Sequence, residues 1–169
     1  MSSLSKIRKI CEDWCTSKSN YKDLLFSINN LINIDILDSC CDRSDIYTRN
    51  LIYLSNSFEV ILMKWPKGTG SLPHDHNGQD CIVVLNSSSL VNTNYYLDCN
   101  GVLKELNKKV IKENNIFKSE TDVIHSISNI SDTTSYSLHL YSKPIRQSKI
   151  YTEDSGEKEL IELTYHKYI

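Results

Sequence analysis

No stretch of this 169-residue chain stays apolar over the roughly 20 consecutive residues that a membrane-spanning helix requires. Residues 1–9 lack the uninterrupted apolar core of a signal peptide, so we expect a cytoplasmic protein. There is also no excess of one charge: the formal net charge is −2, and the lysines are scattered rather than clustered among aromatic residues. These absences predict no contact with a membrane and no nucleic-acid partner.

Cysteine pairs with the spacing of a zinc site are also missing. The six cysteines are Cys11, Cys15, Cys40, Cys41, Cys81 and Cys99. Without a secretion signal the expected compartment is reducing, which argues against a disulfide framework. We interpret five of the six as small buried or indifferent residues and treat Cys81 separately, because of its neighbours in the sequence.

The first quarter of the chain is patterned for helices. Apolar residues recur at helical spacing over residues 4–16 and 20–34, and residues 35–44 are typical of a short helix followed by a loop. Ser19 or Asn20 is a suitable N-cap for the second helix.

Beyond residue 45 the pattern changes to short strands rich in β-branched and aromatic residues. The expected strands are 46–54, 58–65, 81–85, 90–97, 102–107, 110–111, 116–117, 122–130 and 134–141. Strands repeating every 8–12 residues or so predict a mainly β jelly-roll barrel. The polar tail begins at Gln147, and the residues expected to anchor it are Tyr151, Leu160, Leu163 and Tyr165. We therefore expect a single domain, with helices in residues 1–45 packed on a barrel formed by residues 46–169.

Two histidines two residues apart suggest a metal site. His74 and His76 would point to the same face of an extended segment, so both imidazoles can reach one ion. Of the other three histidines, His125 lies in a strand context, and a barrel could bring it opposite the first pair. Isolated histidines in strands are usually core or surface residues, but a pair with a third partner favours metal binding. His166, in the polar tail, is interpreted as a surface residue.

The spacing of these histidines matches the two half-motifs of the cupin barrel. The first is Gly68-x5-His74-x-His76 and the second is His125-x3-Asn129. The match predicts a cupin jelly roll with its metal centre inside the barrel.

The chain departs from the ordinary cupin pattern at the fourth ligand. Asp80 and Cys81 stand where most cupins carry a glutamate, and residues 87–88 are both serine where the half-motif ends in glycine. A centre with three histidines has open positions, so it suits either zinc with an activated water or iron(II) with dioxygen. Its neutral ligands favour an anionic co-ligand such as a thiolate. Asp75 should face the opposite side of the strand, which disfavours a zinc hydrolase.

A second group of polar residues alternates along predicted strands. Ser137, His139 and Tyr141 share one face of their strand and could form a hydrogen-bonded row from hydroxyl to imidazole to phenol. Arg49 shares a face with Tyr47. A strand arginine is often solvated or paired at the surface, whereas an inward one would offer a fork to a carboxylate.

Together these segments resemble cysteine dioxygenase, a thiol dioxygenase family of the cupin superfamily. The resemblance runs from about Ile46 to Pro144. The segments that carry it are Tyr47-Thr48-Arg49-Asn50-Leu51, Trp65, His74-Asp75-His76, Cys81, His125 with Asn129, and Ser137-Leu138-His139-Leu140-Tyr141-Ser142.

The resemblance implies a role for each matching residue. His74, His76 and His125 would bind Fe(II), and Arg49, assisted by Tyr47, would hold the substrate carboxylate. Tyr141 would lie beside the iron, with His139 and Ser137 orienting its phenol. In this family that tyrosine can be joined by a thioether to a cysteine, and the matching cysteine here is Cys81. Trp65 would pack behind the site, or would simply belong to the core. The implied substrates are L-cysteine and dioxygen, the product is cysteine sulfinic acid, and we expect a monomer.

Two departures from this family concern the segment around Tyr141. The usual Ser-Pro-Pro is Ser142-Lys143-Pro144 here, so we expect a trans bond before Lys143, because a cis bond before a non-proline residue costs about 2.5–4 kcal/mol. The segment that ends at Tyr141 is one residue short, which we place in the loop 132–135.

Two other functions remain open on the sequence alone. A 3-mercaptopropionate dioxygenase would have a similar site but typically carries glutamine in place of Arg49. A non-catalytic cupin would bind a metal or a small ligand as a buffer or sensor.

Overall fold

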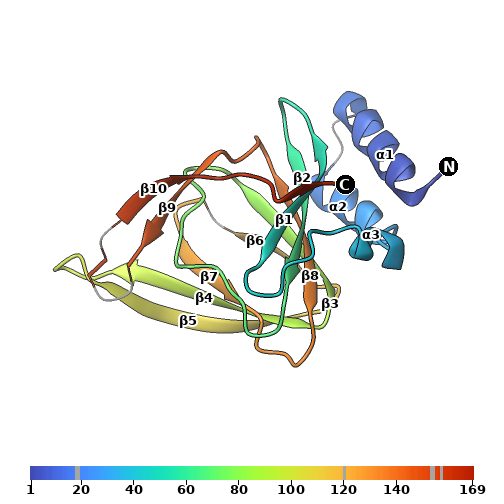
Figure 1. Ribbon diagram of the computed structural model, residues 1–169. Coiled ribbons are helices and arrows are strands. Elements are labelled where there is room, and N and C mark those ends of the chain that lie inside the picture. The colour runs from blue at the N-terminus through green and yellow to red at the C-terminus, as the bar shows by residue number, and fades with distance from the viewer. Residues whose placement is uncertain (18–19, 120, 153–154, 157) are drawn as a thin grey trace.

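The computed structural model describes residues 1–17, 20–119, 121–152, 155–156 and 158–169 (Figure 1). The helices are α1 (Ser3–Ser17), α2 (Tyr21–Asn29) and α3 (Ile34–Asp38). The strands are β1 (Thr48–Leu54), β2 (Glu59–Trp65), β3 (Cys81–Ser87), β4 (Ser89–Leu97), β5 (Leu103–Lys112), β6 (Ile116–Ser119), β7 (Ile124–Ser128), β8 (Ser135–Tyr141), β9 (Gln147–Tyr151), β10 (Lys158–Glu162) and β11 (Lys167–Tyr168).

Asparagine side chains fix where the second and third helices begin. The Asn20 side chain accepts a hydrogen bond from the Lys22 N–H at 2.9 Å, which identifies it as the N-cap of α2; Ser19, the other candidate, lies outside the described residues. Asn33 caps α3 in the same way, through the Ile36 N–H. Helix α2 ends at Asn29, with Asn30 as its C-cap, earlier than the expected residue 34. None of the described helices combines the length and apolar character needed to cross a bilayer.

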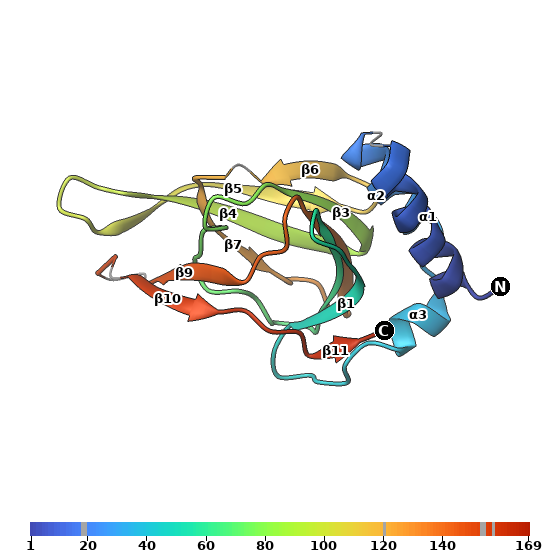
Figure 2. The same cartoon turned by 90° about the horizontal axis from the view of Figure 1, so that it is seen from above.

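The strands form three sheets that face one another around an interior. A six-stranded sheet has the order β11-β1-β2-β8-β3-β6, a three-stranded sheet has the order β5-β4-β7, and β9 pairs with β10. Figure 2 shows the three helices gathered at one end of the molecule, with the β4–β5 and β9–β10 hairpins extending at the other end. The sheets are not closed by continuous pairing, but the jelly-roll cupin class expected from the sequence is confirmed.

Alternation along the six-stranded sheet separates two hydrophobic cores. Val60 and Leu62 of β2 belong to the core that the helices cover, whereas Ile61, Met63 and Trp65 belong to the core of the barrel interior. The neighbouring strand β8 follows the same rule, with its leucines toward the helices and Tyr141 inside. The inner face of this sheet therefore carries the residues that shape the site.

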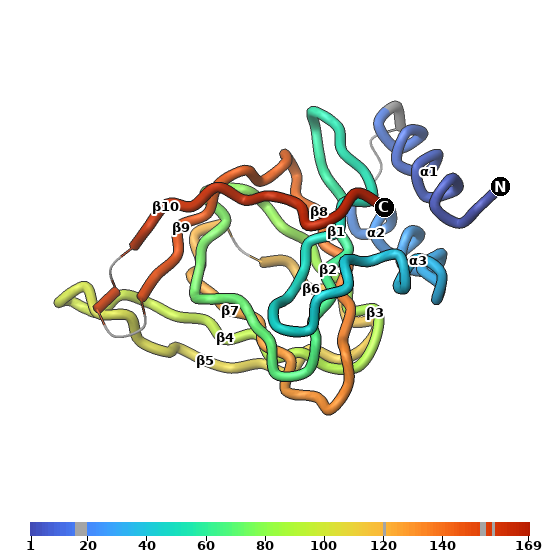
Figure 3. Tube along the Cα trace, in the orientation of Figure 1, coloured from blue at the N-terminus to red at the C-terminus, as the bar shows by residue number. Residues whose placement is uncertain are grey.

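The C-terminal tail is more ordered than the sequence indicated. It contributes β9, β10 and the short β11, which pairs in parallel with β1 and brings the C-terminus beside that strand (Figure 3). Tyr151 is buried as expected, but the prediction that Leu160 anchors the tail is wrong, because that side chain is 53% exposed. The two strands expected over 102–107 and 110–111 are one continuous strand, β5.

Two non-glycine residues adopt positive φ angles at the points where the chain departs from the motifs. Ser88 has φ +64° at the turn between β3 and β4, where the cupin half-motif would place a glycine. Lys143 has φ +120° just after β8. There is no cis peptide bond among the described residues, so the bond before Lys143 is trans, as predicted.

Candidate active site

Three histidines from two segments meet inside the barrel. His74 and His76 lie in the connection between β2 and β3, and His125 lies on β7. The backbones of His74 and His125 exchange two hydrogen bonds of 2.8 and 2.9 Å, which joins the two segments. One nitrogen from each of the three rings lies within 4.8 Å of the others. The predicted convergence of these residues is therefore present in the fold.

The hydrogen bonds of two histidines fix which ring nitrogen is free. His74 Nδ1 lies 2.8 Å from the Leu72 carbonyl oxygen, which can only accept, so Nδ1 carries the proton. His125 Nδ1 lies 2.7 Å from the Asn92 side-chain oxygen, and Asn92 uses its NH2 group to bind Asn94. Both Nε2 atoms therefore present lone pairs, as metal ligands must.

The geometry at the centre fits a metal ion. His76 Nε2 and His125 Nε2 are 3.0 Å apart, and two nitrogens bound at right angles to one ion at about 2.1 Å would lie about 3 Å apart. His76 Nδ1 is buried and has no hydrogen-bond partner within the described chain. Burial, followed by the neighbouring His74, lowers the pKa of His76 to about 3, so this ring is a neutral ligand at pH 7.

The carboxylate of Asp75, between two of these histidines, is used elsewhere. Asp75 accepts a hydrogen bond from the Tyr151 hydroxyl at 3.0 Å and from the Asn77 N–H at 3.0 Å, and lies 3.9 Å from Lys149 Nζ. It points away from the centre, as the alternation of the extended chain predicts. The candidate ligand set therefore contains no carboxylate, and an ion bound there would keep its full charge.

Arg49 brings a buried cation with unused hydrogen-bond donors to the same interior. It lies on β1, is only 5% exposed and lines the interior cavity, so of the two orientations left open by the sequence it has the inward one. Within the described residues, its Nε and Nη2 groups have no hydrogen-bond partner. Its backbone is held by His166, whose Nδ1 accepts from the Arg49 N–H at 3.1 Å and whose own N–H donates to the Arg49 oxygen at 2.9 Å. Buried guanidinium donors without a hydrogen-bond partner are chemically suited to an anionic ligand.

A hydrogen-bonded row crosses the inner face of the sheet. The Trp65 indole N–H donates to Ser137 Oγ at 2.7 Å, and Ser137 Oγ lies 2.7 Å from His139 Nε2. His139 Nδ1 then faces Cys81 Sγ at 3.8 Å. The hydroxyl-to-imidazole part of the expected row is present, but the imidazole continues to the cysteine sulfur, and its contact with the Tyr141 ring is stacking, at 6.3 Å between centroids.

Cys81 and Tyr141 are directly opposite each other in the β3–β8 pairing. The Cβ atoms of opposed residues in a sheet are about 4.5–5.5 Å apart, which allows their side chains to meet. The Tyr141 ring also stands edge-on to His76, 5.5 Å between centroids, so it borders the metal centre. Burial raises the pKa of Cys81 to about 12 and the pKa of Tyr141 well above its ordinary value, so both groups are protonated at pH 7.

Tyr47 and Trp65 form one wall of the site, and Asn129 supports it from behind. The Tyr47 and Trp65 rings stack 4.8 Å apart. Asn129 donates from its side chain to the Trp65 carbonyl at 2.7 Å and to the Thr133 carbonyl at 2.8 Å, which ties the end of β2 to the loop after β7. The asparagine of the second half-motif therefore supports the wall rather than the metal centre.

The site encloses a small cavity of about 170 Å³. Pockets for drug-sized ligands run to roughly 300–1,000 Å³, so this cavity suits a much smaller molecule. It is bordered by the three histidines, Arg49, Cys81 and Tyr141, with apolar side chains such as Ile145 and Leu163 closing it. A small ligand with an anionic end could reach the histidines and Arg49 together.

Four residues near the site were not anticipated from the sequence. Asn92 orients His125, and Glu59, Arg146 and Tyr165 form a cluster beside Arg49. Only Glu59 could have been found from the sequence. It lies six residues before Trp65 on the same strand, so both side chains face the interior. The others come from positions that no spacing rule connects to the histidines.

Comparison with known proteins identifies relatives in sequence. Residues 36–154 match the family model described as cysteine dioxygenase type I. The cysteine dioxygenase type 1 of Homo sapiens is 30% identical over 126 residues, covering 71% of this chain and 62% of the human protein. The protein of the same name from Danio rerio is 28% identical over 125 residues, with 70% and 62% covered. The chain thus spans less than two thirds of the length of these curated relatives.

Comparison with solved structures supports the fold. The Cnp3 cupin domain of Schizosaccharomyces pombe superposes with a TM-score of 0.51 at 13% identity, covering 64% of this chain and 67% of that domain. A cupin superfamily protein from Desulfitobacterium hafniense DCB-2 gives a TM-score of 0.50 at 12% identity, with 69% and 88% covered. At these identities the likeness shows a cupin architecture and nothing about substrate.

Proposed function

Because this chain belongs to the cysteine dioxygenase type I family, we propose that it is an iron(II) thiol dioxygenase that oxidises L-cysteine to cysteine sulfinic acid. One molecule of dioxygen is consumed, and both of its atoms enter the product, so the thiol becomes a sulfinic acid without any other oxidant. The observation that carries the proposal is the buried edge of Arg49, which lacks a partner among the described residues and borders the same small cavity as three converging histidines.

His74, His76 and His125 would hold the iron. Bound there, iron(II) would supply a positive charge for a thiolate and the redox chemistry that activates dioxygen. The three imidazoles are neutral ligands, which supports binding of an anionic sulfur beside them. Asn92 and the Leu72 carbonyl keep His125 and His74 in the tautomers that ligation requires.

Arg49 would position the substrate by its carboxylate. The unpaired Nε and Nη2 groups form the planar fork that matches a carboxylate in a bidentate contact. With the carboxylate of cysteine fixed at Arg49, the cysteine sulfur would be held close to the histidines. This orientation lowers the entropic cost of reaching a reactive geometry. Tyr47 borders the same cavity, with its ring stacked on Trp65.

Tyr141 would act as a hydrogen-bond donor at the reacting atoms. Its pKa is raised by burial, so the phenol keeps its proton and can donate a hydrogen bond to the oxidised sulfur or oxygen beside His76. We also propose that Cys81 and Tyr141 join through a thioether. This join removes the thiol hydrogen and one ring hydrogen, and dioxygen takes up the two electrons and two protons. The join would fix the phenol and raise the rate without being essential.

The proposal is tested by oxygen uptake on protein loaded with different metals. Metal-free, iron(II) and zinc(II) samples are mixed with L-cysteine, with 3-mercaptopropionate or with no thiol. We expect uptake only with iron(II). Uptake should be faster with cysteine, because its amine would bind the iron together with the thiolate, whereas 3-mercaptopropionate carries no amine. If uptake is fastest with 3-mercaptopropionate, that thiol and not cysteine is the substrate. No uptake with either thiol would contradict a dioxygenase function.

Two further proposals concern the assembly and the location of the protein. We expect it to act as a monomer in the cytoplasm, where cysteine is present and reduced. Gel filtration and fractionation of cells that express the protein would check both.

A further inference from the structure

A fully buried carboxylate lies beside Arg49. Glu59 is 0% exposed and stands on the inner face of β2, opposite Tyr141 in the β2–β8 pairing. Glu59 Oε1 is 3.9 Å from Arg49 Nη2, close enough for a charge interaction but too far for a hydrogen bond. A buried carboxylate this near an arginine would normally form a close bidentate pair with it. Glu59 does not form such a pair with Arg49, so other groups must satisfy its carboxylate.

Three donors hold Glu59 away from Arg49. The Ile145 N–H donates to Oε1 at 3.0 Å, Arg146 Nη1 lies 3.3 Å from Oε2, and the Tyr165 hydroxyl also donates to Oε2. Arg146 further donates to the Tyr165 hydroxyl, so the three side chains form a closed cluster. Both carboxylate oxygens are therefore hydrogen-bonded without a hydrogen bond to Arg49.

The charges in this cluster leave one positive charge unbalanced. Two guanidinium groups, Arg49 and Arg146, face one carboxylate, Glu59. The Tyr165 ring lies beside both cations, with the guanidinium carbons 5.8 and 5.6 Å from its centroid. Arg146 is half exposed, so solvent can screen its charge, whereas Arg49 is buried. The excess positive charge inside the cavity is therefore that of Arg49, whose Nε and Nη2 groups also lack hydrogen bonds within the described residues.

We propose that Arg146 and Tyr165 are positioning residues that hold Glu59 and thereby keep Arg49 available for a substrate carboxylate. This inference rests on the proposed role of Arg49 in cysteine binding. Without Arg146, the only described cation beside the buried carboxylate would be Arg49. Glu59 would then pair with it, and the carboxylate of the substrate would have to displace an internal one. Arg146 therefore sets the preference for thiols that carry a carboxylate.

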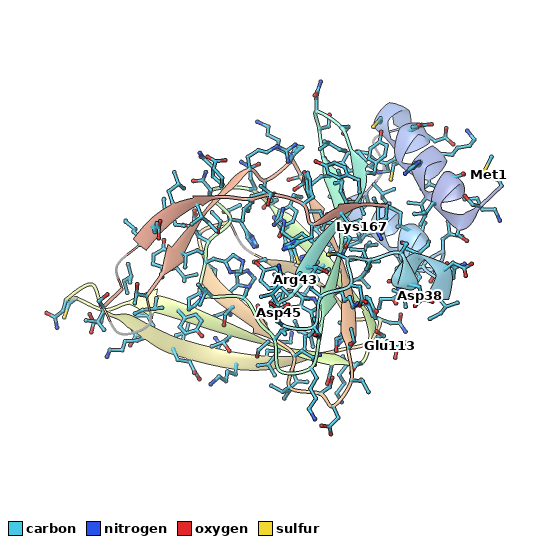
Figure 4. The ribbon with its side chains drawn as sticks, viewed as in Figure 1. Met1, Asp38, Arg43, Asp45, Glu113 and Lys167 are labelled. Atoms are coloured by element: carbon cyan, nitrogen blue, oxygen red, sulfur yellow. The ribbon has the colours of Figure 1, made fainter. Side chains whose placement is uncertain are left out.

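The proposal is tested by binding of two thiols to iron(II)-loaded protein without oxygen. L-cysteine and cysteamine differ by the carboxylate, so isothermal titration with each isolates the contribution of Arg49. The variants are Arg146→Met, the double variant Glu59→Gln with Arg146→Met, and Arg43→Met as a matched control. Arg43 has the same 49% side-chain exposure as Arg146 and pairs with the exposed Asp45 beside it (Figure 4).

We expect Arg146→Met to weaken cysteine binding at least about tenfold, the effect of losing one charge-assisted hydrogen bond, with cysteamine binding unchanged. The double variant removes the competing carboxylate, so cysteine affinity should return to within about twofold of the wild type. A merely structural role would make the double variant worse than the single one. Arg43→Met should leave both affinities unchanged.

The outcomes separate this inference from the proposed function. If wild-type protein binds cysteine no better than cysteamine, Arg49 is not a carboxylate clamp and the proposed function fails with it. If the wild type does discriminate, but Arg146→Met binds both thiols normally or the double variant fails to recover, only the role of Arg146 is overturned. Should Arg146→Met not fold, Tyr165→Phe removes a single hydroxyl from the same cluster, and normal discrimination in that variant would also overturn the inference.

Discussion

Replacing Arg49 by methionine removes the proposed carboxylate clamp while keeping a long side chain in its place. The two unpaired donors of Arg49 are buried, so each is expected to form a strong charge-assisted hydrogen bond with the substrate. Such bonds contribute about 1.5–3 kcal/mol each, and two of them at the lower end give about 3–4 kcal/mol. A loss of that size lowers kcat/KM for cysteine by about 10²–10³-fold.

The assay is steady-state oxygen uptake over a range of cysteine concentrations, with the iron content of each sample measured in parallel. Iron content should match the wild type, because Arg49 is not one of the candidate metal ligands. Cysteamine binding should be almost unaffected, since this thiol has no carboxylate. Unchanged kcat/KM for cysteine in a folded, iron-loaded Arg49→Met protein would refute the assignment, as would an equal loss of affinity for both thiols.

Four further predictions concern the surroundings of the site. Asn92→Ala should weaken iron binding by about 10–100-fold, because it releases the orienting hydrogen bond of the third histidine, as measured by competition with a chelator. Cys81→Ser should abolish the thioether to Tyr141, seen as the absence of the two-hydrogen mass loss expected of turned-over wild type, and should slow turnover without stopping it. Burial lowers the pKa of His139 in the folded protein, so the unfolded chain takes up the proton first as the pH falls. Its stabilising contribution is complete above about pH 6.5 and decreases below it, so between pH 6.5 and 5 metal-free wild type should lose more stability than His139→Gln, measured by urea unfolding. Ser88→Gly should raise the free energy of unfolding by about 1 kcal/mol, because it relieves a left-handed backbone conformation.

Each of these has an outcome that would count against it. Normal iron affinity in Asn92→Ala would mean that the tautomer of the third ligand is fixed by something else. A two-hydrogen mass loss that persists in Cys81→Ser would place the oxidation elsewhere. Parallel pH profiles for wild type and His139→Gln would show that this ring titrates normally, and a destabilised Ser88→Gly would show that the serine side chain matters more than its backbone.

Alternation along strands is what made much of the fold and site predictable. Because successive side chains point to opposite faces, the sequence alone assigns Ser137, His139 and Tyr141 to one face, and these residues do lie inside the barrel. The same rule places Asp75 away from the histidines. Periodicity is a local property, and it predicts local directions well.

Contacts between distant segments could not be predicted in the same way. His166 was interpreted as a surface residue, and its side chain is exposed, yet it holds the backbone of Arg49 because β11 runs beside β1. The tail strands themselves are short and polar, so their sequence carries little alternation. Arg146 and Tyr165 lie outside the regular strands, and only the folded chain brings them to Glu59.

The central claim is that the site places a thiol and dioxygen together so that both oxygen atoms reach the sulfur. Its most direct test is to supply iron(II)-loaded protein with L-cysteine under ¹⁸O₂ and to measure the mass of the product. Cysteine sulfinic acid carrying two heavy oxygen atoms is the predicted result. A product with one heavy oxygen atom, or disulfide with no sulfinic acid, would contradict it.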